Sequence, residues 1–405
     1  MRKDSYDVVI VGGGPVGLTL ALALVRSVAG IRVALLDRRA FAVPHDQRAS
    51  AIAAGARRAF EALGLWPALA PHATPILRMK ITDSGRGDIS RPLFLRFEGE
   101  VAPGEPFAHM LPNTATIEAL LGALADKVDF VAPVEITGTA VTAGGAQVTL
   151  KDGRVLTAPL VVAADGGNSA LRAMAGITTV GHDYRQSGIV TTIGHELEHE
   201  GTAYEHFRPA GPFASLPLAG RRSSLVWTET PEAAARYRQL PLDDVAKEIE
   251  AVMGSSLGSV RVEEPLQVFP LRLQLARSFI APRLALVGDA AHVVHPIAGQ
   301  GLNLGLKDVA ALAEVVIDAM RLGLDHGATD SLERYQRWRR FDTARMGLLT
   351  DTLNRLFSND VAPVRALRDF GLGVVDRLPL LKDAMIARAA GTGNGGPRLL
   401  KGHPI

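Results

Sequence analysis

Residues 288–308 carry a carboxylate, several glycines and an amide in an order that suits the binding of a planar or anionic ligand. The segment contains Gly288-Asp289-Ala290-Ala291-His292 and, further on, Pro296 and Gly299-Gln300-Gly301-Leu302-Asn303. The apolar run before it, 284–287, predicts a buried strand, and the periodic segment 302–322 predicts a helix. Glycine lets a ligand approach the backbone closely, and the free N–H groups of a helix N-terminus favour negative charge. We therefore expect a ligand to lie on this loop.

A second glycine loop opens the chain. Residues 6–11 predict a strand and residues 18–25 predict a helix. Between them, three glycines follow the spacing G-x-G-x-x-G: Gly12, Gly14 and Gly17. A further predicted strand, 32–36, ends on Asp37. This order is the dinucleotide-binding fingerprint, in which the helix N-terminus binds a pyrophosphate and the acidic residue binds a ribose hydroxyl.

A third stretch, 161–169, reads Val-Val-Ala-Ala-Asp-Gly-Gly-Asn-Ser, and Arg172 follows three residues later. The apolar part predicts a buried strand that ends at Asp165, and Asn168 or Ser169 is a suitable cap for a short helix. Asp165 should therefore stand at the carboxyl edge of a strand, where α/β sheets bind ligands.

Together, these three stretches resemble the group A flavoprotein aromatic hydroxylases. The wording of residues 295–308 looks like the ubiquinone-biosynthesis branch of that family, the 2-polyprenylphenol hydroxylases. Further segments with the wording of this branch are 46–49, 205–207, 211–218 and 225–227. The resemblance covers nearly the whole chain, and the segment 288–308 is its most specific part.

The resemblance implies a bound FAD, with NADPH or NADH as reductant, and no metal. It assigns Asp37 to the adenosine ribose, Asp289 to the ribityl chain and residues 299–303 to the N1–C2=O edge of the flavin. It places Arg48 and Asp165 near the cofactor and the nicotinamide. The cofactor-binding positions it implies are Gly12, Gly14, Gly17, Asp37, Arg48, Asp165, Gly288, Asp289, Gly299, Gly301, Leu302 and Asn303. The positions it implies for catalysis are Pro296, Gly299 and Gln300.

The reaction that the resemblance implies is hydroxylation of the aromatic ring of a polyprenylated phenol by a C4a-hydroperoxyflavin, formed from O2 after NAD(P)H reduces the flavin. No residue type in the sequence stands out as a protein base. Two alternatives stay open: a group A hydroxylase of a small aromatic acid, which would need a basic residue facing the ring pocket, and a flavin-binding assembly protein without turnover.

The composition fits a globular protein of this kind. The chain has 405 residues, 47% of them hydrophobic and 21% charged, which is enough for two domains with a shared core. Its net charge of +2 is too small to indicate nucleic-acid binding. It has no cysteine, which excludes disulfides, thiolate metal sites and a cysteine-linked flavin.

No uncharged apolar run is long enough to span a bilayer, and acidic residues interrupt the N-terminal pattern expected of a signal peptide. We expect a cytoplasmic protein that can contact the inner face of the membrane peripherally. Its expected partner is a polyprenylphenol lipid. Contact with other quinone-biosynthesis enzymes and homo-oligomer formation stay open.

The predicted fold class is α/β: a Rossmann-like FAD-binding domain, a discontinuous substrate domain whose β-sheet roofs the flavin, and C-terminal helices. The segments 1–75, 103–180 and 271–345 are assigned to the FAD-binding domain. The segments 76–102 and 181–270 are assigned to the substrate domain. Within the first of these segments, a turn is predicted at 84–88. In the FAD-binding domain, a helix is predicted at 51–63. A hairpin turn is predicted at 151–154.

Two local features depart from simple expectations. Residues 195–199 match the zinc pattern H-E-x-x-H, which needs both histidines on one helix face. Because strand-like sequence precedes them and Gly201 follows, a polar turn between strands is the better interpretation. At Asn113-Thr114, the family commonly has asparagine followed by arginine, so Thr114 removes one expected cofactor contact.

The C-terminal segment, 346–405, is predicted to hold helices and a tail. Residues 346–386 have apolar residues at helical spacing, which indicates either packing against the body or an exposed apolar face for a membrane or partner. Residues 391–405, apart from Leu399 and Leu400, are predicted to be a frayed tail.

Overall fold

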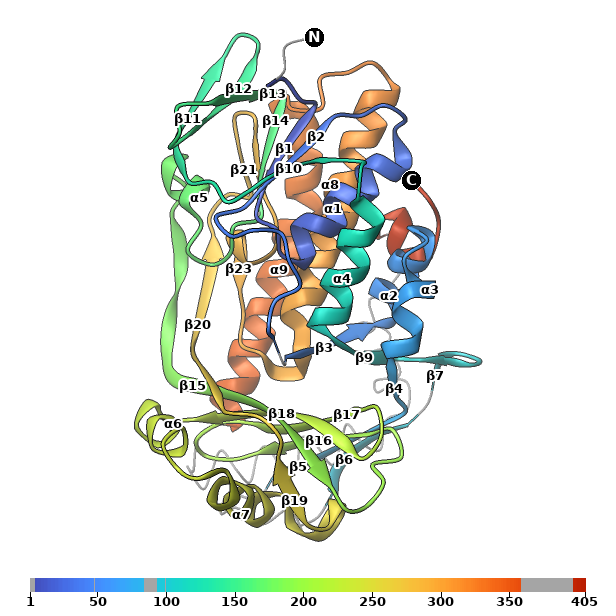
Figure 1. The fold of residues 1–405 in the computed structure, drawn as a ribbon, viewed down its shortest axis with the longest axis vertical. Helices are drawn as coiled ribbons and strands as arrows, with labels where there is room; N and C mark the ends of the chain where they lie inside the picture. Colours follow the sequence, from blue (N-terminus) through green and yellow to red (C-terminus); the bar gives the residue numbers. More distant parts are fainter. Residues whose placement is uncertain (1–3, 47, 84–92, 99, 358–395) are drawn as a thin grey trace.

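The computed structural model describes residues 4–46, 48–83, 93–98, 100–357 and 396–405. Two sheets organise these residues, a largely parallel one in the upper half of Figure 1 and a mostly antiparallel one in the lower half. Two long strands, β15 (Thr179–His195) and β20 (Gln267–Ala276), pair with each other and connect the halves. The predicted α/β class is confirmed.

The upper sheet has the order β10-β2-β1-β14-β22-β21, and all of its neighbouring pairs are parallel except β21–β22. Every residue of its four central strands is buried, which explains why they appear in the sequence as continuous apolar runs. The bounds are β1 (Val8–Val11), β2 (Val33–Leu36), β10 (Asp129–Val131), β14 (Leu160–Ala163), β21 (Ile280–Ala281) and β22 (Leu284–Leu286).

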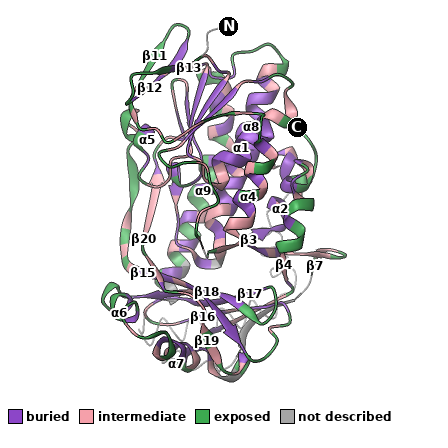
Figure 2. Cartoon of the chain, viewed as in Figure 1, coloured by how far each residue is buried: buried purple, intermediate pink, exposed green. Residues whose placement is uncertain are grey.

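Helices cover this sheet and share its core. Helix α1 contacts both α4 and α8, and the buried residues of these elements form one apolar cluster with the strands, as Figure 2 shows in purple. A small antiparallel sheet of three strands extends the upper half. The turn between its last two strands lies at residues 151–154, as predicted. The bounds are α1 (Pro15–Ser27), α4 (Asn113–Leu124), α5 (Ala170–Met174), α8 (Gln300–Arg321), β11 (Ile136–Thr142), β12 (Gly145–Leu150) and β13 (Val155–Ala158).

A small three-stranded sheet, β3-β9-β4, joins the two halves. The helix predicted at 51–63 begins later, because residues 49–53 pair with β9 as strand β3 before α2 starts. The bounds are β3 (Ala49–Ala53), α2 (Ala54–Ala62), α3 (Trp66–Leu69), β4 (Thr74–Ile76), β7 (Glu100–Ala102), β8 (Glu105–Pro106) and β9 (Ala108–Pro112).

The lower sheet has the order β23-β20-β15-β18-β17-β16-β5-β6, with β19 beside β15, in the described residues. It contains the strands that lie between residues 179 and 229. The bounds are β5 (Arg78–Asp83), β6 (Leu93–Glu98), β16 (Thr202–Phe207), β17 (Phe213–Leu218), β18 (Arg222–Glu229), β19 (Val260–Val262) and β23 (His292–Val293).

The two faces of the lower sheet have different neighbours. The outer face packs Ile189, Phe213 and Trp227 against α6 (Pro231–Tyr237) and α7 (Leu242–Met253). Side chains alternate along a strand, so the residues between these point the other way. We call that side the inner face; it comprises Ile81, Val190, Ala203, Glu205, Ala214, Leu216 and Val226. Ala203 and Leu216 belong to a cluster with Ala51 of β3 and Met110 of β9, so the inner face looks toward the upper half.

The C-terminal part differs from its prediction. Helix α9 (Thr329–Phe357) is continuous through the boundary expected at 345/346. The expectation of a frayed tail is wrong for residues 396–405: Ile405 is buried with Leu399 and Leu400, and the Arg398 N–H donates to Glu314 Oε2 at 2.7 Å. The predicted turn at 84–88 and the predicted helical segment 358–386 lie outside the described residues.

Candidate functional site

The N-terminal glycine loop has two glycines that the fold requires and one that faces open space. A Cβ on Gly12 would lie 2.1 Å from the Ala164 carbonyl oxygen, and a Cβ on Gly17 would lie 2.1 Å from the Gly12 oxygen. A Cβ on Gly14 would meet nothing within 4 Å. Gly14 is also the N-cap of α1 and has no side chain to satisfy the helix N–H groups. The loop therefore leaves room for an anionic ligand at the helix N-terminus.

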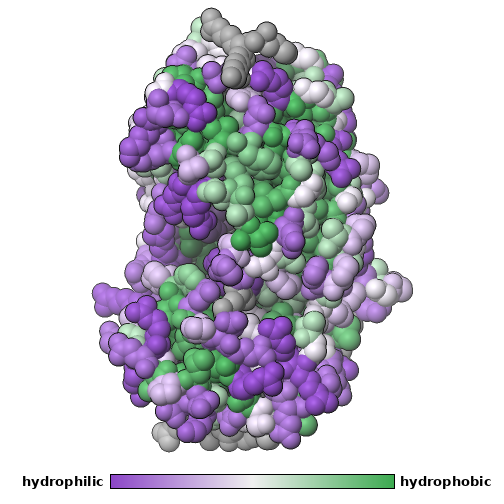
Figure 3. Space-filling model, viewed as in Figure 1, coloured by the Kyte–Doolittle hydropathy of each residue, from purple (hydrophilic) through white to green (hydrophobic). Residues whose placement is uncertain are grey.

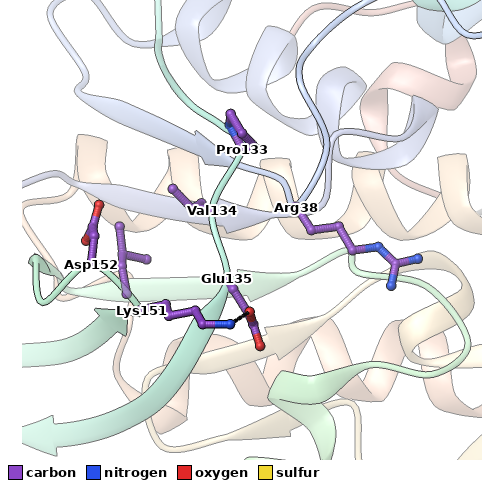
Figure 4. Close-up of a pocket in the computed structure, with 7 residues that line it drawn as sticks. Arg38, Pro133, Val134, Glu135, Lys151 and Asp152 are labelled. Atoms are coloured by element: carbon purple, nitrogen blue, oxygen red, sulfur yellow. Dashed lines mark hydrogen bonds and ion pairs between the residues drawn. The ribbon is translucent and has the colours of Figure 1, made fainter.

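Asp37 fixes the shape of this loop. Its Oδ2 accepts a hydrogen bond from the Gly13 N–H at 2.7 Å, and its Oδ1 accepts one from the Arg39 N–H at 2.8 Å. A cavity of about 590 Å³ opens next to it, lined by Arg38, residues 133–135 and residues 150–152. In Figure 4, Lys151 pairs with Glu135 at one side of the cavity, while Arg38 extends away from that pair. Asp37 thus holds the glycine loop, and the next residue, Arg38, lines the cavity.

The loop that holds Asp289 is fixed from below by a buried ionic network. Asp308 Oδ2 accepts from the Gly288 N–H at 2.9 Å and contacts His292 Nε2 at 2.6 Å, and its Oδ1 accepts from Arg339 Nε at 2.7 Å. Burial opposes ionisation of Asp308, but His292 and Arg339 outweigh it and hold the pKa of its carboxyl below the usual range. The sequence showed Asp308 in its motif but gave no sign of its partner on α9.

The Asp289 side chain reaches solvent at the surface of the loop, and protein atoms surround it on its other sides. This confinement raises the pKa of the Asp289 carboxyl, and His292, Arg48 and Arg272 oppose the rise. Figure 3 shows the surface hollowed on the left flank, at about the height of β23 in Figure 1. A carboxylate with this exposure can accept hydrogen bonds from a ligand hydroxyl.

The second half of the motif is tied to β3. The Asn303 side chain accepts from the Ala53 N–H at 2.9 Å and donates to the Ala51 oxygen at 2.7 Å and the Gly299 oxygen at 3.1 Å. Asn303 therefore positions the loop through its own hydrogen bonds. Gly299 has φ +62°, which favours glycine, and a Cβ on Gly301 would meet nothing within 4 Å.

The remaining motif residues surround this turn. Pro296 precedes the 3₁₀ turn Ile297–Gly299, Gln300 is buried at the start of α8, and Leu302 packs against the upper core. Close by, His295 is fully buried, and neither of its ring nitrogens has a partner among the described residues. Burial lowers the pKa of His295 to about 4, so this side chain is neutral.

Arg48 reaches the boundary between the halves. Its guanidinium is paired with Asp46 at 2.7 Å and lies 5.2 Å from the ring centroid of Phe269 on β20. Asn113 joins the same group: its side chain donates to Asp46 at 3.4 Å and accepts from Ser50 Oγ at 2.8 Å. Asn113 therefore makes hydrogen bonds within the protein. The next residue, Thr114, stands where the family usually has an arginine.

Asp165 caps a helix. Its Oδ2 accepts from the N–H groups of Ala170 and Leu171, at 2.8 and 3.3 Å, while its buried Oδ1 has no partner among the described residues. Arg172 connects this stretch to the late motif by donating to the Ala290 oxygen at 2.8 Å and the Gly167 oxygen at 2.9 Å.

Arg272 of β20 was missed at the sequence level. Its guanidinium donates to Asn168 Oδ1 at 2.7 Å, and its charge opposes the rise in the pKa of Asp289. It connects the stretch 161–169 with Asp289. No motif marks it, because its place depends on the pairing of β20 with β15.

Residues 195–199 do not form a helix. His195 ends β15, and its ring contacts the Leu197 oxygen at 2.7 Å and Ser223 Oγ at 3.1 Å. His199 contacts the Leu218 oxygen at 2.8 Å and accepts from the Gly201 N–H at 3.0 Å. The predicted turn between strands is confirmed, and both histidines serve as hydrogen-bonding groups within the sheet.

A parallel sheet with a G-x-G-x-x-G loop, joined to an antiparallel sheet at the loop 288–303, is the architecture of FAD-dependent aromatic monooxygenases, and the chain is an enzyme of this class. It belongs to the FAD binding domain family, which matches residues 5–346. It is 43% identical to ubiquinone hydroxylase UbiL of Rhodospirillum rubrum over 98% of this chain and 93% of that protein. It is 33% identical to 3-demethoxyubiquinol 3-hydroxylase of Escherichia coli over 96% of this chain and 100% of that protein.

Solved structures show the same fold. Para-nitrophenol 4-monooxygenase PnpA of Pseudomonas putida superposes with a TM-score of 0.80 at 22% identity, covering 96% of this chain and 99% of that one. FAD fits the described residues: Gly14 and Gly301 leave open space, Asp289 is exposed, and Asp165 Oδ1 is buried without a partner. FAD is the cofactor of this chain.

Proposed function

We propose that the chain hydroxylates the aromatic ring of a polyprenylated phenol in ubiquinone biosynthesis, using FAD, O2 and NADPH or NADH. The observation that carries this proposal is the largely apolar inner face of the lower sheet. It packs on Ala51, whose backbone oxygen accepts a hydrogen bond from Asn303 of the cofactor loop. Relatives aligned along nearly the whole chain are named as ubiquinone-biosynthesis hydroxylases, which supports the same substrate class.

We assign the cofactor contacts as follows. Gly12, Gly14 and Gly17 shape the pyrophosphate site, Asp37 faces the adenosine ribose and Asp289 faces the ribityl chain. Residues 296–303 form the surface for the isoalloxazine ring, with Pro296, Gly299 and Gln300 next to the reacting atoms. Segments 1–75, 103–180 and 271–345 would then make the cofactor domain, and 76–102 and 181–270 the substrate domain.

When bound, FAD supplies the redox chemistry: the nicotinamide reduces the flavin, and the reduced flavin activates O2 for transfer to the ring. The chain holds and orients both reactants. The Asp308 network keeps the Gly288 N–H fixed, and Asn303 keeps the Gly299 oxygen fixed, so the ring surface is preorganised. The apolar inner face excludes water from the place where the ring reacts.

A small aromatic acid is a poorer fit. Its carboxylate would need a basic partner near the ring. On the inner face, among the described residues, Arg222 and Arg261 lie at the far end of the sheet, where they are exposed and paired with Glu263. Arg48 is paired with Asp46.

Part of α9 suits contact with a membrane surface. Phe341, Leu348 and Leu349 are 70%, 66% and 49% exposed, and the Arg345 guanidinium lies over the Phe341 ring. In the part of the chain that the structure describes, no helix is both long and apolar enough to cross a bilayer. We propose that this α9 face meets the membrane that holds the lipid substrate, where arginine near anionic headgroups adds about 1 kcal/mol of attraction.

Deletion of the gene tests the substrate class. The deletion strain should accumulate a polyprenylated phenol that lacks one ring hydroxyl, and the purified FAD-loaded protein should convert that compound in vitro. Accumulation of a small aromatic acid, or an unchanged set of quinone precursors, would contradict the proposal.

A further inference from the structure

Glu205 is the charged residue in the middle of the inner face. On β16 it stands directly beside Ile81 of β5 and Ala214 of β17. The same row continues through Val226 of β18 and Val190 of β15. Among the described residues of this row, Glu205 alone is charged, and apolar side chains flank it on both sides.

The Glu205 carboxylate has no partner among the described residues. It is 6% exposed, and no hydrogen bond or ion pair joins it to any residue that the structure describes. Burial alone raises the pKa of Glu205 to about 7. The contrast with Glu229 of the same sheet is informative, because Glu229 is also 6% exposed but accepts from Arg208 at 2.7 Å and from Trp227 at 3.0 Å on the outer face.

The charged groups near the inner face are engaged elsewhere. Arg48, from the loop before β3, is paired with Asp46, and the ring of His109 of β9 makes an edge-on contact with Trp66. The far end of the sheet carries Glu263 with its two arginines. None of these charges contributes to the shift in the pKa of Glu205.

A buried carboxylate without a hydrogen bond destabilises the fold unless a ligand supplies the donor. The side chains in the row around Glu205 are apolar, as a partner surface for an aromatic ring must be, and a phenol would bring one O–H donor. We propose that Glu205 binds the phenolic hydroxyl of the substrate and takes its proton during ring hydroxylation, an inference that rests on the proposed function.

The step is a proton transfer from oxygen to oxygen. The phenolic O–H bond breaks, a new O–H bond forms on a Glu205 carboxylate oxygen, and the electron pair stays on the ring oxygen. The ring carbons ortho and para to that oxygen become richer in electrons and accept the electrophilic oxygen that the cofactor provides. The attacked carbon then releases its own proton to water, the C–H electron pair restores the aromatic ring, and Glu205 returns its proton to the ring oxygen. A base with a pKa near the working pH is efficient in such a transfer.

The test compares holoenzymes carrying Glu205→Gln and Glu205→Ala with wild type and with Glu229→Gln as the matched control. The probes are 2-prenylphenol and its methyl ether, which lacks the donor. Binding is measured by titrating the FAD absorbance spectrum, and hydroxylation is measured from pH 5.5 to 9. FAD content and melting temperature are recorded for each protein.

We expect Glu205→Gln to retain FAD, to melt no lower than wild type, and to lose about 100-fold in kcat/KM for 2-prenylphenol. Its rate should also lose the pH limb that wild type shows near neutrality. Wild type should bind the phenol at least about tenfold more tightly than the ether, whereas Glu205→Ala should not discriminate. Glu229→Gln should keep the wild-type pH limb and the preference for the phenol.

Either of two results would overturn the assignment of Glu205. One is an unchanged pH limb and unchanged preference for the phenol in both Glu205 variants. The other is loss of FAD and of thermal stability with the limb retained, which marks a structural residue. If wild type binds 2-prenylphenol with the predicted preference but hydroxylates no prenylated phenol, the proposed function fails while the binding role of Glu205 stands.

Discussion

The loop 288–308 and the inner face of the lower sheet meet at one site but satisfy their polar groups in opposite ways. The two polar residues that fix the shape of the loop have completed contacts: Asp308 has three partners, and Asn303 has three. The inner face carries Glu205, which has none among the described residues. Completed polar contacts fix the shape of the cofactor surface, whereas an uncompleted one is where a substrate can be recognised.

Breaking the loop network should have the largest effect. Asp308→Ala removes the fully buried carboxylate that His292 and Arg339 share, and loss of one partner from a buried ionic network typically costs about 3–5 kcal/mol. We expect a large drop in the free energy of urea unfolding and loss of FAD. Asp342→Ala is the matched control, because it removes the more exposed partner of Arg339 and should cost much less. Equal losses in the two variants would show that the buried network does not hold the loop.

Variants of Gly301 and Gly12 distinguish the loss of ligand contact from the loss of packing. Gly301→Val should leave the protein folded, because a Cβ there meets nothing within 4 Å, yet it should abolish hydroxylation by blocking the flavin. Gly12→Ala should lower thermal stability, since its Cβ would lie 2.1 Å from a backbone oxygen. Circular dichroism melting and an assay of bound FAD distinguish the two. Normal turnover in Gly301→Val would contradict the assigned cofactor surface.

His295 should make stability depend on pH. Its pKa is about 4 in the folded protein against an ordinary value of 6.5, so the unfolded chain binds the additional proton. Stability is therefore complete above about pH 6.5 and falls as the pH drops toward 4, with a contribution of about 2 kcal/mol lost at pH 5.

Urea unfolding at pH 7 and pH 5 measures this loss of stability. His295→Leu should show a smaller difference between the two pH values than wild type. His109→Gln should also reduce the difference, because burial lowers the pKa of His109 to about 4 as well. An identical pH dependence in wild type and His295→Leu would mean that His295 gains a hydrogen-bond partner in solution.

The smallest expected effect concerns the exposed face of α9. Changing Phe341, Leu348 and Leu349 to glutamine should lower turnover of a long-tailed phenol in vesicles several-fold, while a short soluble analogue is turned over as before. Leu324→Gln is the control, because Leu324 is 57% exposed but lies in the connection between α8 and α9, outside α9 itself. Equal effects on both substrates would assign the α9 face to folding.

The sequence predicted what depends on short segments. The glycine loop 12–17, the strand end at Asp37 and the loop 288–303 each combine spacing with a local strand–loop–helix order, and these arrangements are present. Contacts between distant segments could not be predicted: Arg339 reaches Asp308, and Glu205 is placed on the inner face only by the pairing of β16 with β5 and β17. The tail was misjudged because its glycine-rich composition hid the burial of Ile405.

The central claim is that this chain transfers one atom of O2 to the ring of a polyprenylated phenol. FAD-loaded protein, NADPH and the phenol that accumulates in the deletion strain are incubated under oxygen-18 gas, and the product is analysed by mass spectrometry. We predict a new ring hydroxyl that contains oxygen-18, formed with the consumption of NADPH. NADPH consumption that yields only hydrogen peroxide, or a hydroxyl oxygen that comes from water, would contradict the account.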